Sequence, residues 1–140
     1  MKQWSTKQLL RSDFMGFIQY NPNPEGKYVG DCVIRALTIL LNDTWDNIYI
    51  DLSMTGFHMH DMPNSNAVWG EFLKMNGFKQ YPLPDTCPNC YTVKQFCMDF
   101  PEGVYMVATG SHVVAVIDGN YYDTGDSGNE VPIYYWRKER

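Results

Sequence analysis

Basic residues are scarce in this chain. Eleven Lys and Arg stand against sixteen Asp and Glu, which gives a net charge of −5, and the only basic run is the short tail from Arg137 to Arg140. Proteins hold nucleic acids mainly by neutralising phosphates with Lys and Arg, so that affinity depends on a basic surface. The composition therefore predicts that nucleic acid is not a partner.

Long apolar segments are also missing. No stretch approaches the roughly 20 apolar residues that a membrane-spanning helix requires. Residues 1–13 are mixed and polar, without the apolar stretch of a signal peptide. These absences predict no membrane partner and residence in a cytoplasm.

Cysteine is limited to Cys32, Cys87, Cys90 and Cys97. Thiols are generally kept reduced in a cytoplasm, whereas disulfide frameworks are typical of small exported domains. We therefore expect the four cysteines to be mainly reduced thiols, metal ligands or a nucleophile.

Apolar and aromatic side chains, in contrast, are plentiful. Hydrophobic residues make up 44% of the chain, aromatic residues 15% and charged residues 19%. This composition can fill a core and is unlike that of disordered segments. Because 140 residues are enough for one domain of ordinary size and no repeat or linker is present, we expect a single domain over residues 1–140.

Helical patterns dominate the first two thirds of the chain. Between Val33 and Leu41 the residues are apolar almost all round, which predicts a buried helix, with Asp31 as its N-cap and Cys32 at its start. Other helices are expected over residues 3–10, from the cap Thr44 to about Leu52, from Asn66 to Asn76, and after a capping box formed by Thr92 and Gln95. Residues 21–26, 55–64 and 81–91 are expected to be turns or irregular loops.

The pattern changes after Pro101. Residues 104–109 and 113–117 are β-branched and aromatic runs, and a tight turn at 118–120 leads to Tyr121 and Tyr122. A last strand is expected over residues 131–136. Helices followed by an antiparallel meander predict an α+β fold.

Three residues suggest nucleophilic chemistry. A helix N-terminus stabilises a thiolate through its free N–H groups and dipole, and Cys32 has that position. Of the three histidines, His112 stands at the start of the apolar strand 113–117, where the sheet would hold its backbone while the ring stays accessible. Asp123 follows the partner strand of the hairpin and could fix the tautomer of His112.

These motifs resemble the papain-like cysteine peptidase superfamily. The likeness is carried by Gly30-Asp31-Cys32 opening an apolar helix, Gly110-Ser111-His112 opening an apolar strand, and Tyr121-Tyr122-Asp123 after a turn. It covers residues 21–136 and is closest to small bacterial and phage members, near the bacteriocin-processing peptidases. The resemblance implies a helical half around the Cys-bearing helix packed on a twisted antiparallel sheet.

The resemblance also implies the roles of the site residues. Cys32 would be the nucleophile, His112 the general base and acid, and Asp123 the orienting third member of a triad. Family members cleave peptide, isopeptide or other amide bonds through an acyl-enzyme, without a metal or other cofactor. The expected partner is then a peptide or protein substrate, and the compartment a bacterial cytoplasm, or that of the host cell for a phage-encoded protein.

One departure from the family pattern concerns the oxyanion. Papain-like enzymes usually place a Gln six residues before the cysteine, and here that position is Gly26. Gln19, Asn23 or Asn21 could serve instead, beside the backbone N–H of Cys32, with Gln19 favoured for its reach. Because losing one such donor typically costs about a hundredfold in rate or more, an inactive or weakly active binding module is the main alternative to a hydrolase.

Several residues have more than one interpretation. Asp126 is a substitute for Asp123 as the third member of the triad. Cys87-Pro88-Asn89-Cys90 is a Cys-x-x-Cys motif that, with Cys97 and a loop histidine, could complete a zinc site. A zinc-stabilised adaptor built on Cys87, Cys90 and His58 or His60 is a further alternative. The second half of the usual zinc pattern is missing and Cys97 falls on an apolar helix face, so burial explains this cysteine better.

Overall fold

The computed structural model describes residues 16–139 of the chain. Its elements are β1 (Phe17–Gln19), α2 (Cys32–Leu40), α3 (Trp45–Met59), α4 (Asn66–Met75), β2 (Phe78–Pro82), α5 (Val93–Asp99), β3 (Val104–Ala108), β4 (Val113–Ile117), β5 (Asn120–Asp123) and β6 (Tyr134–Lys138). The α+β class predicted from the sequence is confirmed. The helix expected over residues 3–10 lies outside the described residues.

The strands form one six-stranded sheet in the order β1-β5-β4-β3-β6-β2. Strands β3, β4 and β5 are joined as the predicted antiparallel meander, and β6 and β2 continue the antiparallel pairing at one edge. At the other edge β1 runs parallel to β5, so the sheet is mixed and the expectation of a wholly antiparallel sheet is wrong. Parallel neighbours need a long connection between them, and here the whole helical part of the chain intervenes.

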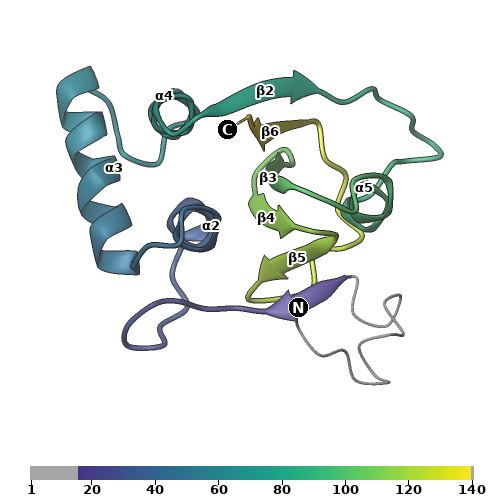
Figure 1. Ribbon diagram of the computed structural model, residues 1–140, viewed down its shortest axis with the longest axis horizontal. Helices are drawn as coiled ribbons and strands as arrows, with labels where there is room; N and C mark the ends of the chain where they lie inside the picture. The colour runs from purple at the N-terminus through teal and green to yellow at the C-terminus, as the bar shows by residue number, and fades with distance from the viewer. Residues whose placement is uncertain (1–15, 140) are drawn as a thin grey trace.

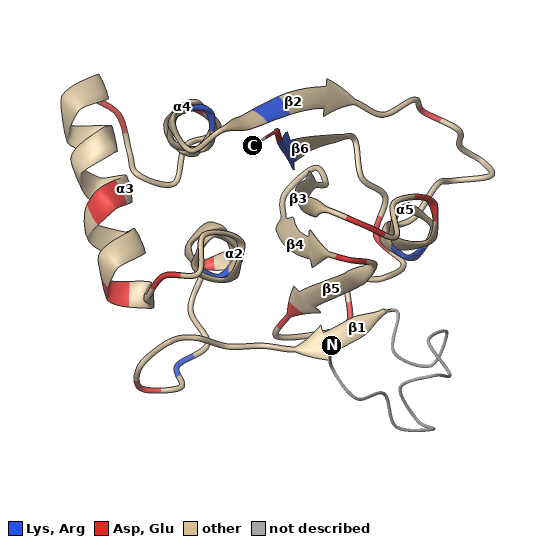
Figure 2. Cartoon of the chain, viewed as in Figure 1, with Lys and Arg blue, Asp and Glu red and all other residues tan. Residues whose placement is uncertain are grey.

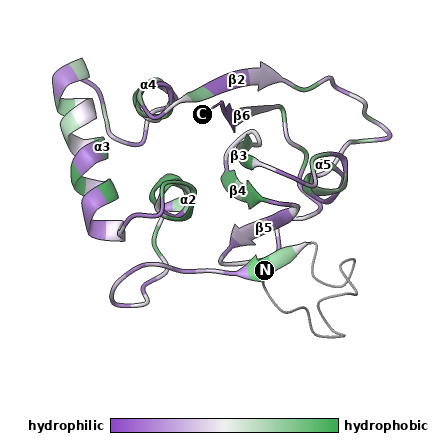
Figure 3. Ribbon diagram, viewed as in Figure 1, coloured by the Kyte–Doolittle hydropathy of each residue, from purple (hydrophilic) through white to green (hydrophobic). Residues whose placement is uncertain are grey.

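The sheet is covered on both faces. Helices α2, α3 and α4 lie on one side of it and α5 on the other (Figure 1). Alternate residues of β3 therefore enter different cores: Met106 and Ala108 pack in the cluster beneath α2, whereas Tyr105 and Val107 pack in the cluster with α5. Burial on both faces explains why β3 and β4 are almost continuously apolar in sequence, as their green colour in Figure 3 indicates.

Two helices differ from their predicted form at one end. Asp31 occupies the N-cap position of α2, but its side chain accepts no hydrogen bond from the backbone N–H groups of the helix, so the expected capping role is wrong. Helix α3 continues into the predicted loop, as far as Met59. Gly56 lies within this helix, and the following loop packs on it so closely that a Cβ would lie 2.8 Å from the carbonyl oxygen of Asp61.

Strands at the sheet edge were predicted less well than those at its centre. Residues 78–82 form β2, although the region from Tyr81 was expected to be irregular, and β1 was not predicted. Strand β6 begins at Tyr134 rather than at Val131. Pro132 explains the later start, because proline has no N–H to donate to a neighbouring strand.

Cys87 and Cys90 form a disulfide in the loop between β2 and α5. The expectation of reduced thiols is therefore wrong for this pair, while Cys32 and Cys97 are free thiols. Among residues 16–139, no helix has the length and apolar character that crossing a membrane would require.

Candidate active site

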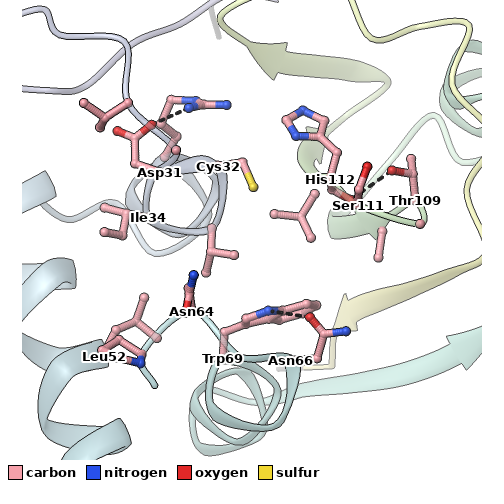
Figure 4. Close-up of a pocket in the computed structure, with 18 of the residues that line it drawn as sticks. Asp31, Cys32, Ile34, Leu52, Asn64, Asn66, Trp69, Thr109, Ser111 and His112 are labelled. Carbon is pink, nitrogen blue, oxygen red and sulfur yellow. Dashed lines mark hydrogen bonds and ion pairs between the residues drawn. The ribbon is translucent and has the colours of Figure 1, made fainter. Parts of the chain in front are cut away.

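Cys32 is the first residue of α2, a helix of nine residues. Its side chain is half-buried, and the sulfur points from the end of the helix into a cavity (Figure 4). No side chain caps this end of α2. The N–H groups of the first turn and the positive end of the helix dipole are therefore free to act on a negative charge at or beside the sulfur.

His112 immediately precedes β4 and faces Cys32 across the cavity (Figure 4). Strand β4 is hydrogen-bonded to β3 on one side and to β5 on the other, and residues 113–116 are buried. The backbone that carries the imidazole is thus fixed by the centre of the sheet, while the ring itself stays partly accessible.

Asp123, the last residue of β5, holds the other side of the imidazole. Its Oδ2 lies 2.6 Å from Nε2 of His112. This contact leaves Nδ1 of His112 as the ring nitrogen available to Cys32. Helix α2 and the hairpin of β4 and β5 are distant in sequence, and together they bring Cys32, His112 and Asp123 next to one another.

The Asp123 carboxylate is itself fully hydrogen-bonded. Oδ1 accepts from the backbone N–H of Thr124 at 2.7 Å, and Oδ2 accepts from the hydroxyl of Ser127 at 2.8 Å. Nη2 of Arg35 also donates to Oδ1 at 3.1 Å. A buried carboxylate needs such partners to remain ionised, so Asp123 is held as an anion in one orientation.

Arg35 connects this carboxylate with a second one. Its Nη1 forms an ion pair with Asp31, and the other oxygen of Asp31 accepts a hydrogen bond from Nε1 of Trp45 at 2.8 Å. All three charged residues, Asp31, Arg35 and Asp123, are buried. The network joins the first turn of α2 to the start of α3 and the end of β5, and it explains why Asp31 does not cap its own helix.

Opposing effects act on the pKa of the Cys32 thiol. Burial raises its pKa, but the hydrogen bond with the His112 side chain and one from the backbone of Val113 lower it, as do the positive charges of His112 and Arg35. The lowering effects prevail, so the pKa of Cys32 lies below its ordinary value. The thiolate is the reactive form of cysteine, and this environment favours it.

The pKa of His112 is shifted in the complementary direction. The hydrogen bond to Asp123 raises it most, the hydrogen bond with Cys32 adds to the rise, and burial opposes both. Burial also tends to raise the pKa of Asp123, but the hydrogen bonds from His112 and Ser127 bring it below the ordinary value. A lowered thiol pKa beside a raised imidazole pKa favours a thiolate–imidazolium pair.

The cavity in front of Cys32 has a volume of about 560 Å³. Its walls come from both halves of the molecule: Leu52 on α3, Trp69 on α4 and Tyr134 on β6 supply apolar surface, and Asn64 and Asn66 supply amides. The indole N–H of Trp69 donates to the Asn66 oxygen at 3.1 Å, which fixes the indole ring (Figure 4). Asp31 and Arg35 also line the cavity and are paired with each other.

The predicted oxyanion side chains lie elsewhere. Gln19 is exposed on β1, and the side-chain oxygen of Asn23 accepts from the backbone N–H groups of Glu25 and Lys27 in the turn. Neither residue lines the cavity, and Asn21 does not line it either. The expectation that Gln19 or Asn23 contributes to this site is not supported by their positions.

The structure also gives the positions of the other residues that the sequence offered for the triad or for a metal site. Asp126 accepts hydrogen bonds from the Tyr121 hydroxyl and the Gly128 backbone rather than from His112, so Asp123 is the carboxylate beside the imidazole. His58 and His60 are exposed at the end of α3 and do not line the cavity. Within residues 16–139 no three His, Cys, Asp or Glu side chains are grouped as a metal site would need, and the sulfurs of Cys87 and Cys90 are bonded to each other.

Sequence reasoning missed the parts played by Arg35, Trp45 and Ser127. A signal for Arg35 was available, because it is the only charged residue in an otherwise apolar helix, four residues after Asp31. Arg is almost never fully buried without a partner, and residues four apart meet on a helix surface. The contact with Asp123 has no such local signal.

Comparisons with models of protein families, with curated proteins and with solved structures found no match to this chain. The arrangement of side chains in the site is therefore the basis on which its function is argued.

Proposed function

We propose that this protein is a cysteine hydrolase with a papain-like fold, which cleaves a peptide, isopeptide or related amide bond through an acyl-enzyme. The observation that carries the proposal is the juxtaposition of Cys32, at a free helix N-terminus, with His112 and Asp123 at the edge of one cavity. A nucleophile, a base within reach and a third group that orients the base are the parts required for covalent acyl transfer.

The proposed reaction begins with attack of the Cys32 thiolate on the carbonyl carbon of the substrate. The carbonyl π electrons move to oxygen, and the resulting tetrahedral intermediate collapses with cleavage of the C–N bond. Nδ1–H of His112 gives its proton to the leaving nitrogen, which departs as an amine and leaves a thioester on Cys32. His112 is then neutral and ready to act as a base.

Water completes the reaction. Neutral His112 removes a proton from a water molecule, whose oxygen attacks the thioester carbon. The second tetrahedral intermediate expels the Cys32 thiolate and releases a carboxylic acid, which restores the thiolate–imidazolium pair. An amine in place of water would give a new amide through the same residues, so an acyltransferase uses the same machinery.

Backbone groups are proposed to stabilise the oxyanion. The N–H groups in the first turn of α2, beginning with Cys32, receive no side-chain cap and point from the positive end of the helix dipole. Because the cap position is occupied by Asp31, whose carboxylate is turned toward Arg35 and Trp45, this end of the helix stays open to substrate.

The cavity favours an uncharged substrate group. Its charged lining residues are already paired, and Leu52, Trp69 and Tyr134 supply apolar area. Gly30 and Gly110 border the cavity, and a Cβ on either would meet no other atom within 4 Å. Open glycines of this kind allow a substrate backbone to approach closely, which favours an extended peptide.

A second candidate function is a binding module with weak or no turnover. It is favoured by one observation: none of the side chains predicted to hold the oxyanion, Gln19 above all, lines the cavity. Loss of one side-chain donor from an oxyanion hole typically costs about 100- to 1000-fold in kcat. A protein of this kind would bind its peptide in the same cavity and release it unchanged.

Turnover is tested with a pool of peptide amides of varied sequence, monitored by mass spectrometry for both cleaved products and a covalent adduct on Cys32. The hydrolase proposal predicts cleavage that Cys32→Ser and His112→Ala each abolish. Cys97→Ala serves as the matched control, because this thiol is buried away from the cavity, and it should retain cleavage. Binding without cleavage or adduct by the wild-type protein would favour the binding module instead.

A further inference from the structure

Helix α3 is apolar on two opposite sides. Its inner side, formed by Ile48, Leu52 and Gly56, is buried. Its outer face, which we define by Ile50, Met54 and Phe57, follows an i, i+4, i+7 spacing, and these residues are 58%, 48% and 70% exposed. This spacing places all three on one stripe of the helix, and the stripe points away from the core.

These exposed apolar side chains lie together, unlike the single apolar residues that are common on protein surfaces. Met62, in the loop after α3, adds a further side chain that is 66% exposed, and a shallow hollow lies between Phe57 and Met62. Helix α3 stands at the edge of the described molecule, with no other described element beyond it (Figure 1). Contiguous apolar stripes on a soluble protein mark interaction surfaces, and exposed methionines adapt readily to a partner.

The setting of this stripe is acidic. No Lys or Arg occurs between Arg35 and Lys74. Asp46 and Asp51 are exposed on α3, and helical spacing puts one on each side of the outer face. Figure 2 shows acidic residues on α3 and no basic ones.

We propose that the outer face of α3 docks an amphipathic helix with a basic polar side, supplied by a partner protein. Apolar residues of the partner helix would cover Ile50, Met54 and Phe57, and its Lys or Arg residues would pair with Asp46 and Asp51 at the rim. An amphipathic helix that docks on such a surface contacts it through its own residues at i, i+3, i+4 and i+7, so its apolar face can run along the stripe of α3. Helix α3 has 15 residues and spans about 22 Å, so a partner helix of about 15 residues matches its length.

Charge decides between this partner and the other occupants of such a face. A second copy of the chain would bring two acidic stripes together in a protein whose net charge is already −5, and like charges opposed at an interface are unfavourable. An anionic bilayer would repel the same stripe, because membrane-surface helices rely on Lys and Arg in their polar face. An amphipathic helix with a basic polar side can both cover the apolar stripe and pair with the acidic residues at its rim.

This surface is separate from the candidate active site, although the same helix serves both. Leu52, on the inner side of α3, lines the cavity, and Trp45, at the start of α3, donates to Asp31. Residues Ile50, Met54 and Phe57 do not line the cavity. The docking proposal therefore holds or fails without reference to hydrolysis.

The test uses three fluorescently labelled 15-residue peptides and measures binding to the full chain by anisotropy in 0.15 M salt. One peptide places Leu at helical spacing with Lys elsewhere, the second has the same composition in scrambled order, and the third has Glu in place of Lys. We expect saturable binding of the first peptide at least tenfold tighter than of the other two. Absence of binding, or equal binding of the scrambled peptide, would overturn the proposal.

Variants test whether the Leu/Lys peptide binds on the outer face of α3. Ile50→Ser with Phe57→Ser should weaken binding of the Leu/Lys peptide at least tenfold, and Asp46→Asn with Asp51→Asn should weaken it and flatten its salt dependence. The matched control is Met98→Ser with Ile133→Ser, which removes two apolar side chains elsewhere that are 65% and 50% exposed and should leave binding unchanged. Unchanged binding by the α3 variants would refute the assignment, as would a wild-type dimer in sedimentation that Phe57→Ser dissociates.

Discussion

Arg35 brings a full charge into the protein interior between two carboxylates. Its side chain contacts Asp31 on its own helix and Asp123 at the end of β5, and all three residues are less than 9% exposed. Buried charges are tolerated only when they are paired and hydrogen-bonded. The guanidinium has enough donors in a fixed plane to serve both carboxylates at once, which a lysine could not do with the same geometry.

Removal of this cation should be strongly destabilising. In Arg35→Met, Asp31 and Asp123 become two buried carboxylates with no cation between them. Breaking a buried ion pair in this way costs about 3–5 kcal/mol. We expect the free energy of unfolding, measured in urea at pH 7, to fall by about 3–5 kcal/mol.

A double variant separates lost charge from lost packing. Arg35→Met combined with Asp31→Asn removes the carboxylate that is left without a cation, because Asp123 still pairs with His112, so part of the lost stability should return. A loss of less than about 1 kcal/mol in Arg35→Met, or no recovery in the double variant, would contradict the role assigned to the buried network.

Asp123 should give the protein a defined response to acid. Its pKa lies below the ordinary value in the folded state, owing to the hydrogen bonds from His112 and Ser127 that overcome its burial. The ionised carboxylate therefore contributes stability that is present above the unfolded-state pKa of about 4 and is lost as the pH falls through the folded-state value.

The variant Asp123→Asn removes that contribution. Wild-type protein should be more stable than the variant at pH 7, and the difference in unfolding free energy should narrow as the pH falls below about 4. Urea unfolding at several pH values measures this difference. A difference that stays constant down to pH 3 would show that the carboxylate is not ionised through these hydrogen bonds.

At the scale of elements, local sequence signals located helix ends well where a side chain caps the backbone. Thr44 and Thr92 were predicted as caps, and the Thr92 and Gln95 capping box is present in α5. Asp31 fails as a cap although its residue type is suitable, because Arg35 and Trp45 compete for the same carboxylate. Competition of this kind comes from tertiary contacts, which periodicity does not reveal.

The capping box of α5 offers a direct check of such a local signal. The Thr92 hydroxyl accepts from the backbone N–H of Gln95 at 3.3 Å, and the Gln95 side chain accepts from the backbone N–H of Thr92 at 2.8 Å. Thr92→Ala should lower the free energy of unfolding by about 1 kcal/mol. Thr92→Ser keeps the hydroxyl and should lose much less in the same urea titration. Equal losses in the two variants would assign the effect to the methyl group rather than to the cap.

Edge strands were the hardest elements to predict. Strand β1 has only three residues, and β2 includes Pro82 and two exposed polar residues, Lys79 and Gln80, so neither carries an apolar run. Their pairing with β5 and β6 joins segments about 50 to 100 residues apart. Central strands β3 and β4 are buried on both faces and were evident from β-branched and aromatic residues alone.

At the scale of the whole molecule, the fold assembles the site from segments that lie about 80 to 90 residues apart. The places of Cys32 at the start of α2 and of His112 just before β4 were predictable, because the apolar runs that follow them are evident in the sequence. The cavity walls were not predictable, since Leu52, Trp69 and Tyr134 come from three elements with no common motif. The oxyanion prediction failed because Gln19 lies on an edge strand that the sequence pattern did not reveal.

The fold also leaves one free thiol partly exposed. Cys87 and Cys90 are joined to each other, and Cys97 is buried with a pKa that burial raises to about 12. Cys32 is consequently the one cysteine for which the described surroundings favour a thiolate. Alkylation of the native protein thus reports on this residue alone.

The central claim, that Cys32 and His112 form a thiolate–imidazolium pair, is tested most directly by the rate of Cys32 alkylation with iodoacetamide at pH 6, located by peptide mass mapping. An unperturbed thiol is less than about 1% thiolate at this pH. We predict that Cys32 reacts at least tenfold faster than free cysteine, and that His112→Ala or unfolding in urea removes the advantage. A native Cys32 that reacts no faster than free cysteine at pH 6 would contradict the pair and the hydrolase built on it.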